Sequence, residues 1–296
     1  MFSKPGFAAS PLTESSVDPH GKLTRKRGMT RGQKLLFFLT AWLICLMPFL
    51  FWWNTWFGRK LSDRQLNDYL HDTKKPRHIQ QALVQVGERI TGQDASAKQW
   101  YPDLVRLAGD PVEEVRNTDA WVMGQDTSGA GFHDALLKML NDSSPMVRGN
   151  AALSLVRFGD ASGRPQIAAL LQPAQLTAPQ SGRIVDSDRP GTAIHQRGLI
   201  AKLKYGDGQT VEIRSPIPGR IRSVAGTGAN VAAGAEIAVI DPSTEQVWEA
   251  LRALYLVGQP EDISAIRPYE RELPDVSNDV RQQALETERA IRARSR

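Results

Sequence analysis

The sequence has little cysteine and histidine, which limits the chemistry that it can support. It contains one cysteine, Cys45, among 296 residues, so an internal disulfide is excluded and the folded part must be stabilised by packing. A zinc site needs three or four ligands that converge on one metal ion. The five histidines are scattered instead, at His20, His71, His78, His133 and His195. We therefore predict no metal site.

The sequence motifs of common enzymes are also missing. The chain has no G-x-S-x-G nucleophile motif, no Walker loop and no recognisable pairing of cysteine with histidine. We therefore predict no catalytic residue, no cofactor and no small-molecule substrate. These absences favour a protein that acts by binding rather than by catalysis.

The basic charge of the chain is confined to its N-terminal part. The formal net charge is +5, from 37 lysines and arginines against 32 acidic residues. Residues 1–57 hold seven basic and two acidic residues, which leaves 30 of each sign in the rest. A nucleic-acid-binding domain presents a basic face on its folded part, and this balance argues against one.

A long apolar segment follows the basic residues. No side chain is charged from Leu35 to Phe57, and tryptophans gather near its end at 52, 53 and 56. This pattern is typical of a transmembrane helix, which we expect over residues 34–57. The stronger basic flank precedes it and favours a cytoplasmic N-terminus, with a disordered tail over residues 1–33 and periplasmic folded domains. A cleaved signal peptide is the competing interpretation.

A short pattern, D-x4-V-R, occurs three times after this segment. The copies begin at Asp110, Asp142 and Asp275 and end at Arg116, Arg148 and Arg281. Each copy joins two short apolar helical patterns and thus resembles the inter-helix turn of HEAT repeats, which stack into α-solenoids. We expect the solenoid over residues 58–173 and 242–296. Its aspartates are expected to cap the following helix, and its arginines to reach the aspartate of a neighbouring unit.

One repeat unit is interrupted. Residues 163–173 fit a first helix, and residues 241–258 fit the turn and second helix that should follow directly. Inter-helix turns tolerate inserted domains whose ends lie close together. We therefore expect residues 174–241 to form a separate domain inserted into this turn.

The insert contains two copies of a glycine motif, "APQSGRI" at 178–184 and "SPIPGRI" at 215–221. Such duplication resembles the biotinyl and lipoyl domains, and this resemblance implies an all-β barrel-sandwich hybrid. The fold class expected for the whole chain is therefore α+β multidomain. In the family, a lysine at a hairpin tip carries the cofactor. Here Gly208 occupies that position after Asp207, and glycine offers no nucleophile for attachment.

Unmodified domains of this kind behind an N-terminal membrane helix resemble periplasmic adaptor, or membrane-fusion, proteins. The resemblance implies a membrane-anchored scaffold that binds protein partners of an inner-membrane complex, above all one in transport or secretion. Two alternatives stay open. The protein could be an assembly or stability subunit of a respiratory or other multisubunit membrane complex, or it could be a lipoyl or biotin carrier.

Overall fold

The computed structural model describes residues 31–56, 60–271 and 276–296. The chain divides into two units, Met1–Arg59 and Lys60–Arg296, which are described separately. In the first unit, α1 runs from Arg31 to Trp56. The predicted disordered tail lies almost entirely outside the described residues.

The predicted membrane anchor is corrected by the structure. A helix that crosses a bilayer needs about 20 consecutive residues that are mostly apolar. In the part of the chain that the structure describes, no helix has both the length and the hydropathy to do so. The transmembrane helix expected at 34–57, and the inner-membrane location with periplasmic domains that depended on it, are therefore contradicted.

The second unit begins with helices arranged in pairs, as the repeated turns predicted. In the first three pairs the helices are α2 (Asp63–Leu70) with α3 (Pro76–Thr91), α4 (Tyr101–Leu107) with α5 (Glu113–Met123), and α6 (Phe132–Met139) with α7 (Pro145–Arg157). A 3-10 helix, η1 (Ala95–Trp100), leads into α4. The last two pairs are α8 (Arg164–Ala169) with α9 (Thr244–Val257), and α10 (Ile263–Ile266) with α11 (Asn278–Arg294). Two more 3-10 helices, η2 (Pro260–Asp262) and η3 (Arg267–Glu270), flank α10.

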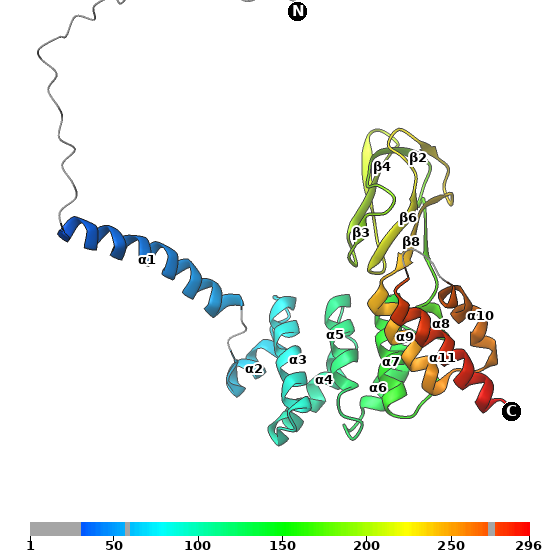
Figure 1. Cartoon of the computed structure of the whole chain (residues 1–296), viewed down its shortest axis with the longest axis horizontal. Helices are drawn as coiled ribbons and strands as arrows, with labels where there is room; N and C mark the ends of the chain where they lie inside the picture. Colours follow the sequence, from blue (N-terminus) through cyan, green and yellow to red (C-terminus); the bar gives the residue numbers. More distant parts are fainter. Residues whose placement is uncertain (1–30, 57–59, 272–275) are drawn as a thin grey trace, which may run out of the picture. The chain divides into compact units, whose positions relative to one another are not determined.

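The second helices of successive pairs pack on one another, α3 on α5, α5 on α7, α7 on α9 and α9 on α11. We call these five the B helices. Figure 1 shows α3, α5 and α7 side by side. Fully buried side chains such as Leu83, Phe132 and Leu155 fill one continuous core between the helix layers. This stacking is the α-solenoid architecture.

Serine side chains start four of these helices. Ser62, Ser144, Ser243 and Ser277 are the N-cap residues of α2, α7, α9 and α11. Each hydroxyl accepts a hydrogen bond from the backbone N–H three residues later, which satisfies one of the donors that a helix N-terminus leaves free. The sequence therefore fixes the start of each of these helices locally.

The segment between α8 and α9 forms eight strands. These are β1 (Ala174–Thr177), β2 (Gly182–Ser187), β3 (Ala193–Ile194), β4 (Leu199–Tyr205), β5 (Gln209–Arg214), β6 (Gly219–Val224), β7 (Asn230–Val231) and β8 (Glu236–Pro242). They form two four-stranded antiparallel sheets, with strand orders β1-β8-β6-β3 and β5-β4-β2-β7. Figure 1 shows β2, β4, β6 and β8 gathered in this region.

The barrel-sandwich hybrid predicted for residues 174–241 is contradicted, because the structure has two antiparallel sheets and not a closed barrel. In the described strands, backbone pairing ends at β1 and β3 in one sheet and at β5 and β7 in the other, so the strands do not close into one sheet. The two sheets instead share one apolar core, in which Ile184, Leu203, Ile221 and Ile240 are almost fully buried. Side-chain packing between two sheets, rather than ring closure, holds this domain together.

The duplicated motif is visible in the pairing of the short strands. β7 pairs with β2 at Gly182, and β3 pairs with β6 at Gly219. The short strand of each half therefore pairs with a strand of the other half. Gly182 and Gly219 are the equivalent glycines of the two motif copies. The two halves therefore depend on each other for their edge strands.

The insert also contacts the solenoid directly. Gln196, in the turn between β3 and β4, donates to Glu113 Oε1 at 2.7 Å, and Arg197 forms an ion pair with Glu114. Both glutamates lie in the first turn of α5. Met146, in the first turn of α7, packs against the core of the insert. The insert is thus held to the helices by side-chain contacts as well as by its two chain connections.

Gly208 lies at the tip of the β4–β5 hairpin with φ of +99°. An L-residue with a side chain rarely adopts this conformation, so we expect Gly208→Ala to lower the free energy of unfolding by about 1 kcal/mol. Denaturant unfolding of the full chain measures this change. Gly226→Ala is the matched control, because a Cβ there meets nothing within 4 Å and the backbone is not in the left-handed region. Equal effects of the two substitutions would contradict the expectation.

Candidate protein-binding surface

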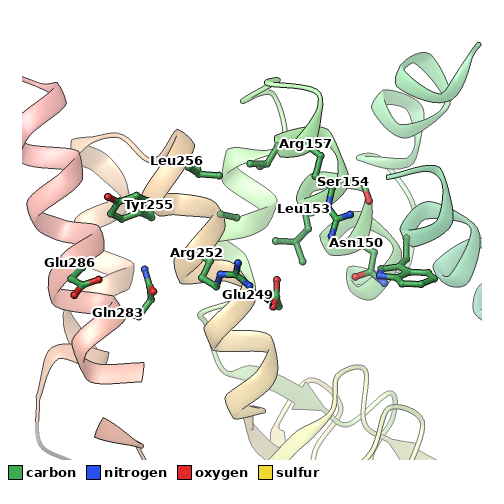
Figure 2. Close-up of a pocket in the computed structure, with 13 residues that line it drawn as sticks. Asn150, Leu153, Ser154, Arg157, Glu249, Arg252, Tyr255, Leu256, Gln283 and Glu286 are labelled. Atoms are coloured by element: carbon green, nitrogen blue, oxygen red, sulfur yellow. Dashed lines mark hydrogen bonds and ion pairs between the residues drawn. The ribbon is translucent and has the colours of Figure 1, made fainter. Parts of the chain in front are cut away.

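A groove of about 600 Å³ runs over the B helices. We call it the B-helix groove. It is formed by side chains from α5, α7, α9 and α11, and Figure 2 shows α9 on one side of it and α7 on the other. Its lining residues are Trp121, Asn150, Leu153, Ser154, Val156, Arg157, Glu249, Arg252, Ala253, Tyr255, Leu256, Gln283 and Glu286. The β-insert interrupts the chain directly before α9, so the two walls come from either side of the insertion.

Helical spacing brings the lining residues to one face of each helix. On α7, Asn150, Ser154 and Arg157 follow one another by four and three positions. On α9, Glu249, Arg252 and Leu256 are spaced by three and four. Residues at these separations are neighbours on a helix surface. Figure 2 shows Glu249 and Arg252 facing Asn150 and Leu153 across the groove.

The groove exposes large apolar side chains to solvent. Trp121 is 45% exposed, Tyr255 is 43% exposed and Leu256 is 62% exposed. Single exposed apolar residues are ordinary, but a group of them in one concave site is typical of an interaction surface. Removing these three side chains from water on binding is the main source of affinity that the groove offers.

The polar side chains of the groove are held in place by neighbouring residues. Asn150 Nδ2 donates to Asn117 Oδ1 at 2.9 Å, which links α7 to α5. Arg157 donates to Gln125 Oε1 at 2.8 Å. Amides and charges of both signs therefore surround the apolar side chains, and they can pair with the polar groups of a peptide.

Two of the predicted repeat positions pair between units. Arg116 Nε donates to Asp142 Oδ2 at 2.6 Å and its Nη2 donates to Oδ1 at 2.9 Å, a bidentate pair that joins two successive inter-helix turns. Burial raises the pKa of Asp142, but hydrogen bonds from Arg116 and from the backbone of Ser144 outweigh it and hold this pKa below its usual value. Arg116 and Asp142 thus tie adjacent units together.

The aspartates do not cap the following helices as predicted. Asp110 Oδ1 accepts from Val112 N at 2.8 Å, and Asp142 Oδ1 accepts from Ser144 N at 2.8 Å. In each case the aspartate oxygen accepts from the backbone N–H two residues later. This arrangement is an Asx-turn, and it ends before the helix begins. The cap of α7 is supplied by Ser144 instead. The aspartate therefore shapes the turn.

The remaining repeat positions differ from one another. Arg148 donates through Nη1 to the carbonyl oxygens of Asp142 and Ser143, at 2.7 and 3.0 Å. Arg281 Nη2 donates to Asn278 Oδ1 at 3.3 Å. Asp275 lies outside the described residues. Of the predicted set, the structure brings Asp110, Arg116, Asp142 and Arg148 together along two successive turns.

Asp119 is an unusual residue that the sequence interpretation missed. Its side chain is fully buried in α5, and both carboxyl oxygens lack a hydrogen-bond partner within the described structure. Burial raises the pKa of Asp119 well above its usual value, although Arg106 lowers it. Aligning the D-x4-V-R copies places Asp119 where the others have Ala151 and Ala284. An acidic residue at an otherwise apolar repeat position was the available signal.

Comparisons with known proteins bear mainly on the helical part. Residues 134–162 match the HEAT repeat family. A search of curated proteins finds no match. Among solved structures, the chain is similar to a designed armadillo repeat protein in complex with the peptide (KR)4, at 16% identity and a TM-score of 0.40, over 76% of this chain and 80% of that one.

A second solved structure is a single-chain, multi-domain long-chain acyl-CoA carboxylase, at 15% identity and a TM-score of 0.23. The match covers 48% of this chain and 14% of that one.

The HEAT match runs through most of α6, α7 and the turn after them. Over residues 134–162 the predicted HEAT repeat is confirmed. The helical part that the structure describes is a repeat solenoid.

Proposed function

We propose that this protein is a non-enzymatic scaffold that binds a protein partner through the B-helix groove. The observation that carries the proposal is the exposure of Trp121, Tyr255 and Leu256 in one groove that crosses four helices. Stacked helix pairs present an extended concave surface of this kind, which fits a polypeptide better than a compact ligand. The binding energy comes from the apolar side chains, and the surrounding amides and charges set the orientation.

The β-insert supplies a second docking surface in this proposal. Gln196 and Arg197 hold it to Glu113 and Glu114 at the start of α5. A partner on the insert and a partner in the groove would therefore be kept at a defined distance. A protein that holds two partners in this way acts as an adaptor. This role does not require the membrane helix on which the expected envelope location depended.

The proposal is tested by placing a charge in the groove. Leu256→Glu puts a carboxylate among apolar contacts, and we expect partner binding to weaken at least tenfold, the scale of an interface hot spot (about 1.4 kcal/mol or more). The side chain is largely exposed, so the thermal unfolding midpoint should stay within about 2 °C of wild type. Affinity capture from the native source, followed by titration of the retained partner, measures the effect.

Val105→Glu is the matched control. Val105 is 37% exposed on α4 and does not line the B-helix groove. It should retain the partner with the affinity of the wild type. If both variants bind equally well, or if both lose the partner, the groove is not the binding surface.

A further inference from the structure

A second cavity, of about 360 Å³, lies where the insert joins the solenoid. We call it the junction pocket. Its walls come from the first turn of α7, from α8, from the start of β1, from the turn before β6 and from α9. Apolar side chains such as Leu170 and Ile217 form part of the lining, and among the described residues that line it only Arg148 is charged.

Comparison with Arg116 shows that Arg148 lacks a carboxylate partner among the described residues. Arg116 Nη1 donates to the carbonyl oxygens of Asp110 and Pro111, at 2.8 and 3.2 Å. Its Nε and Nη2 donate to the two carboxylate oxygens of Asp142. Arg148 Nη1 is held in the same way, by the carbonyl oxygens of Asp142 and Ser143. Within the described structure, however, its Nε and Nη2 have no hydrogen-bond partner.

The insertion accounts for the missing carboxylate. The next turn of the solenoid would supply the aspartate that pairs with Arg148, as Asp142 does for Arg116. That turn is occupied by the insert, and Asp241, the aspartate ahead of α9, lies in β8. Asp241 forms an ion pair with Arg222 inside the insert instead. The Nε and Nη2 donors of Arg148 therefore lie at the junction pocket without a carboxylate partner in the described structure.

Two glutamines that line the same cavity hold oxygen atoms without a hydrogen-bond partner among the described residues. Gln246 Nε2 donates to Leu170 O at 2.8 Å, and Gln166 Nε2 donates to Leu140 O at 3.4 Å. The Oε1 atom of each is buried and has no partner among the described residues. Buried amide oxygens normally accept a hydrogen bond. Because these two lie beneath the pocket surface, a ligand N–H group reaches one of them only after the amide side chain turns towards the cavity.

We propose that the junction pocket binds a carboxylate with an adjacent N–H group, as in an aspartyl residue of a peptide. Arg148 Nε and Nη2 take the two carboxylate oxygens in the geometry that Arg116 and Asp142 already show. The amide of Gln166 or Gln246 turns towards the cavity and accepts the N–H group, and the apolar wall covers the rest of the residue. Because this pocket is separate from the B-helix groove, the inference does not depend on the proposed function.

The test uses two small probes of nearly the same shape, N-acetyl-aspartate N′-methylamide, which carries a carboxylate, and N-acetyl-asparagine N′-methylamide, which carries a neutral amide in its place. Each is titrated into the full-length chain, and the Nε–Hε signal of Arg148 is followed by NMR and assigned by its loss in Arg148→Lys. We expect the aspartyl probe to shift this signal with a Kd on the order of 1 mM, and the asparaginyl probe to bind at least tenfold more weakly.

Binding of the aspartyl probe, followed by calorimetry, should be lost in Arg148→Lys, because a lysine cannot form the bidentate pair. It should persist in Arg281→Lys, which changes the same repeat position in the last unit. No saturable shift in the wild type, or equal shifts with both probes, would overturn the proposal. Succinate has carboxylates but no N–H group. If it binds more tightly than the aspartyl probe, the pocket does not recognise a peptide N–H group, and that part of the proposal is wrong.

Discussion

Replacing Asp119 with alanine is expected to raise the free energy of unfolding by about 2 kcal/mol at pH 7. The wild type buries a carboxyl group whose two oxygens have no partner in the described structure. Alanine removes that cost and restores the residue type that the equivalent positions carry at Ala151 and Ala284. Urea unfolding of both proteins, followed by circular dichroism, measures the difference.

The size of this difference should depend on pH. Burial raises the pKa of Asp119 in the folded state, so the folded protein keeps a proton that the unfolded chain releases above about pH 4. The bound proton contributes its full stabilisation below that pH, and the contribution is lost as pH rises towards the folded-state pKa. The advantage of the alanine variant should therefore be small at pH 4 and should grow up to pH 7.

Asp119→Asn separates charge from burial. It keeps a buried polar group but cannot titrate, so its difference from Asp119→Ala should be independent of pH. A less stable alanine variant at pH 7 would show that the carboxyl group has a partner that the described contacts lack.

Gly219→Ala is expected to destabilise the insert by about 3 kcal/mol or more. A Cβ at this position would lie 1.8 Å from Asp241 O on the neighbouring strand, and a backbone atom cannot move aside at low cost. Gly182, its equivalent in the other motif copy, approaches Lys204 O in the same way, at 2.4 Å, so Gly182→Ala should also be strongly destabilising.

Hydrogen exchange of the β6 and β8 amides measures the local stability of the insert. We expect exchange there to accelerate at least a hundredfold in Gly219→Ala, which corresponds to about 2.7 kcal/mol. Gly226→Ala, which meets no atom within 4 Å, should leave it unchanged. Equal exchange in all three proteins would show that β6 and β8 do not approach as closely as described.

The sequence predicted the parts of the fold that depend on local pattern. The D-x4-V-R copies identified the helix pairs, because a turn that begins with aspartate and leads into an apolar helix is a local signal. The same alignment explains the bond from Arg116 to Asp142, since equivalent residues of stacked units are neighbours in space. The two glycine motifs pointed to a duplicated β-domain, and the structure has strands from Ala174 to Pro242.

Features that depend on how elements pack could not be predicted in this way. The motif symmetry does not determine whether sheets close into a barrel, because closure depends on the pairing of edge strands such as β3 and β7. An uncharged apolar run, with tryptophans at its end and basic residues before it, led to the membrane helix that the structure does not support. The B-helix groove arises from the spacing of α7 and α9 around the insertion, which no local pattern encodes.

Hydrogen–deuterium exchange of the chain with and without its bound partner tests the central claim most directly. If the partner occupies the B-helix groove, peptides from α7 and α9 that contain Leu153, Arg157, Arg252 and Leu256 should exchange more slowly in the complex. Peptides from α2, α4 and α6 should not change. Protection confined to those first helices, with α7 and α9 unchanged, would contradict the account.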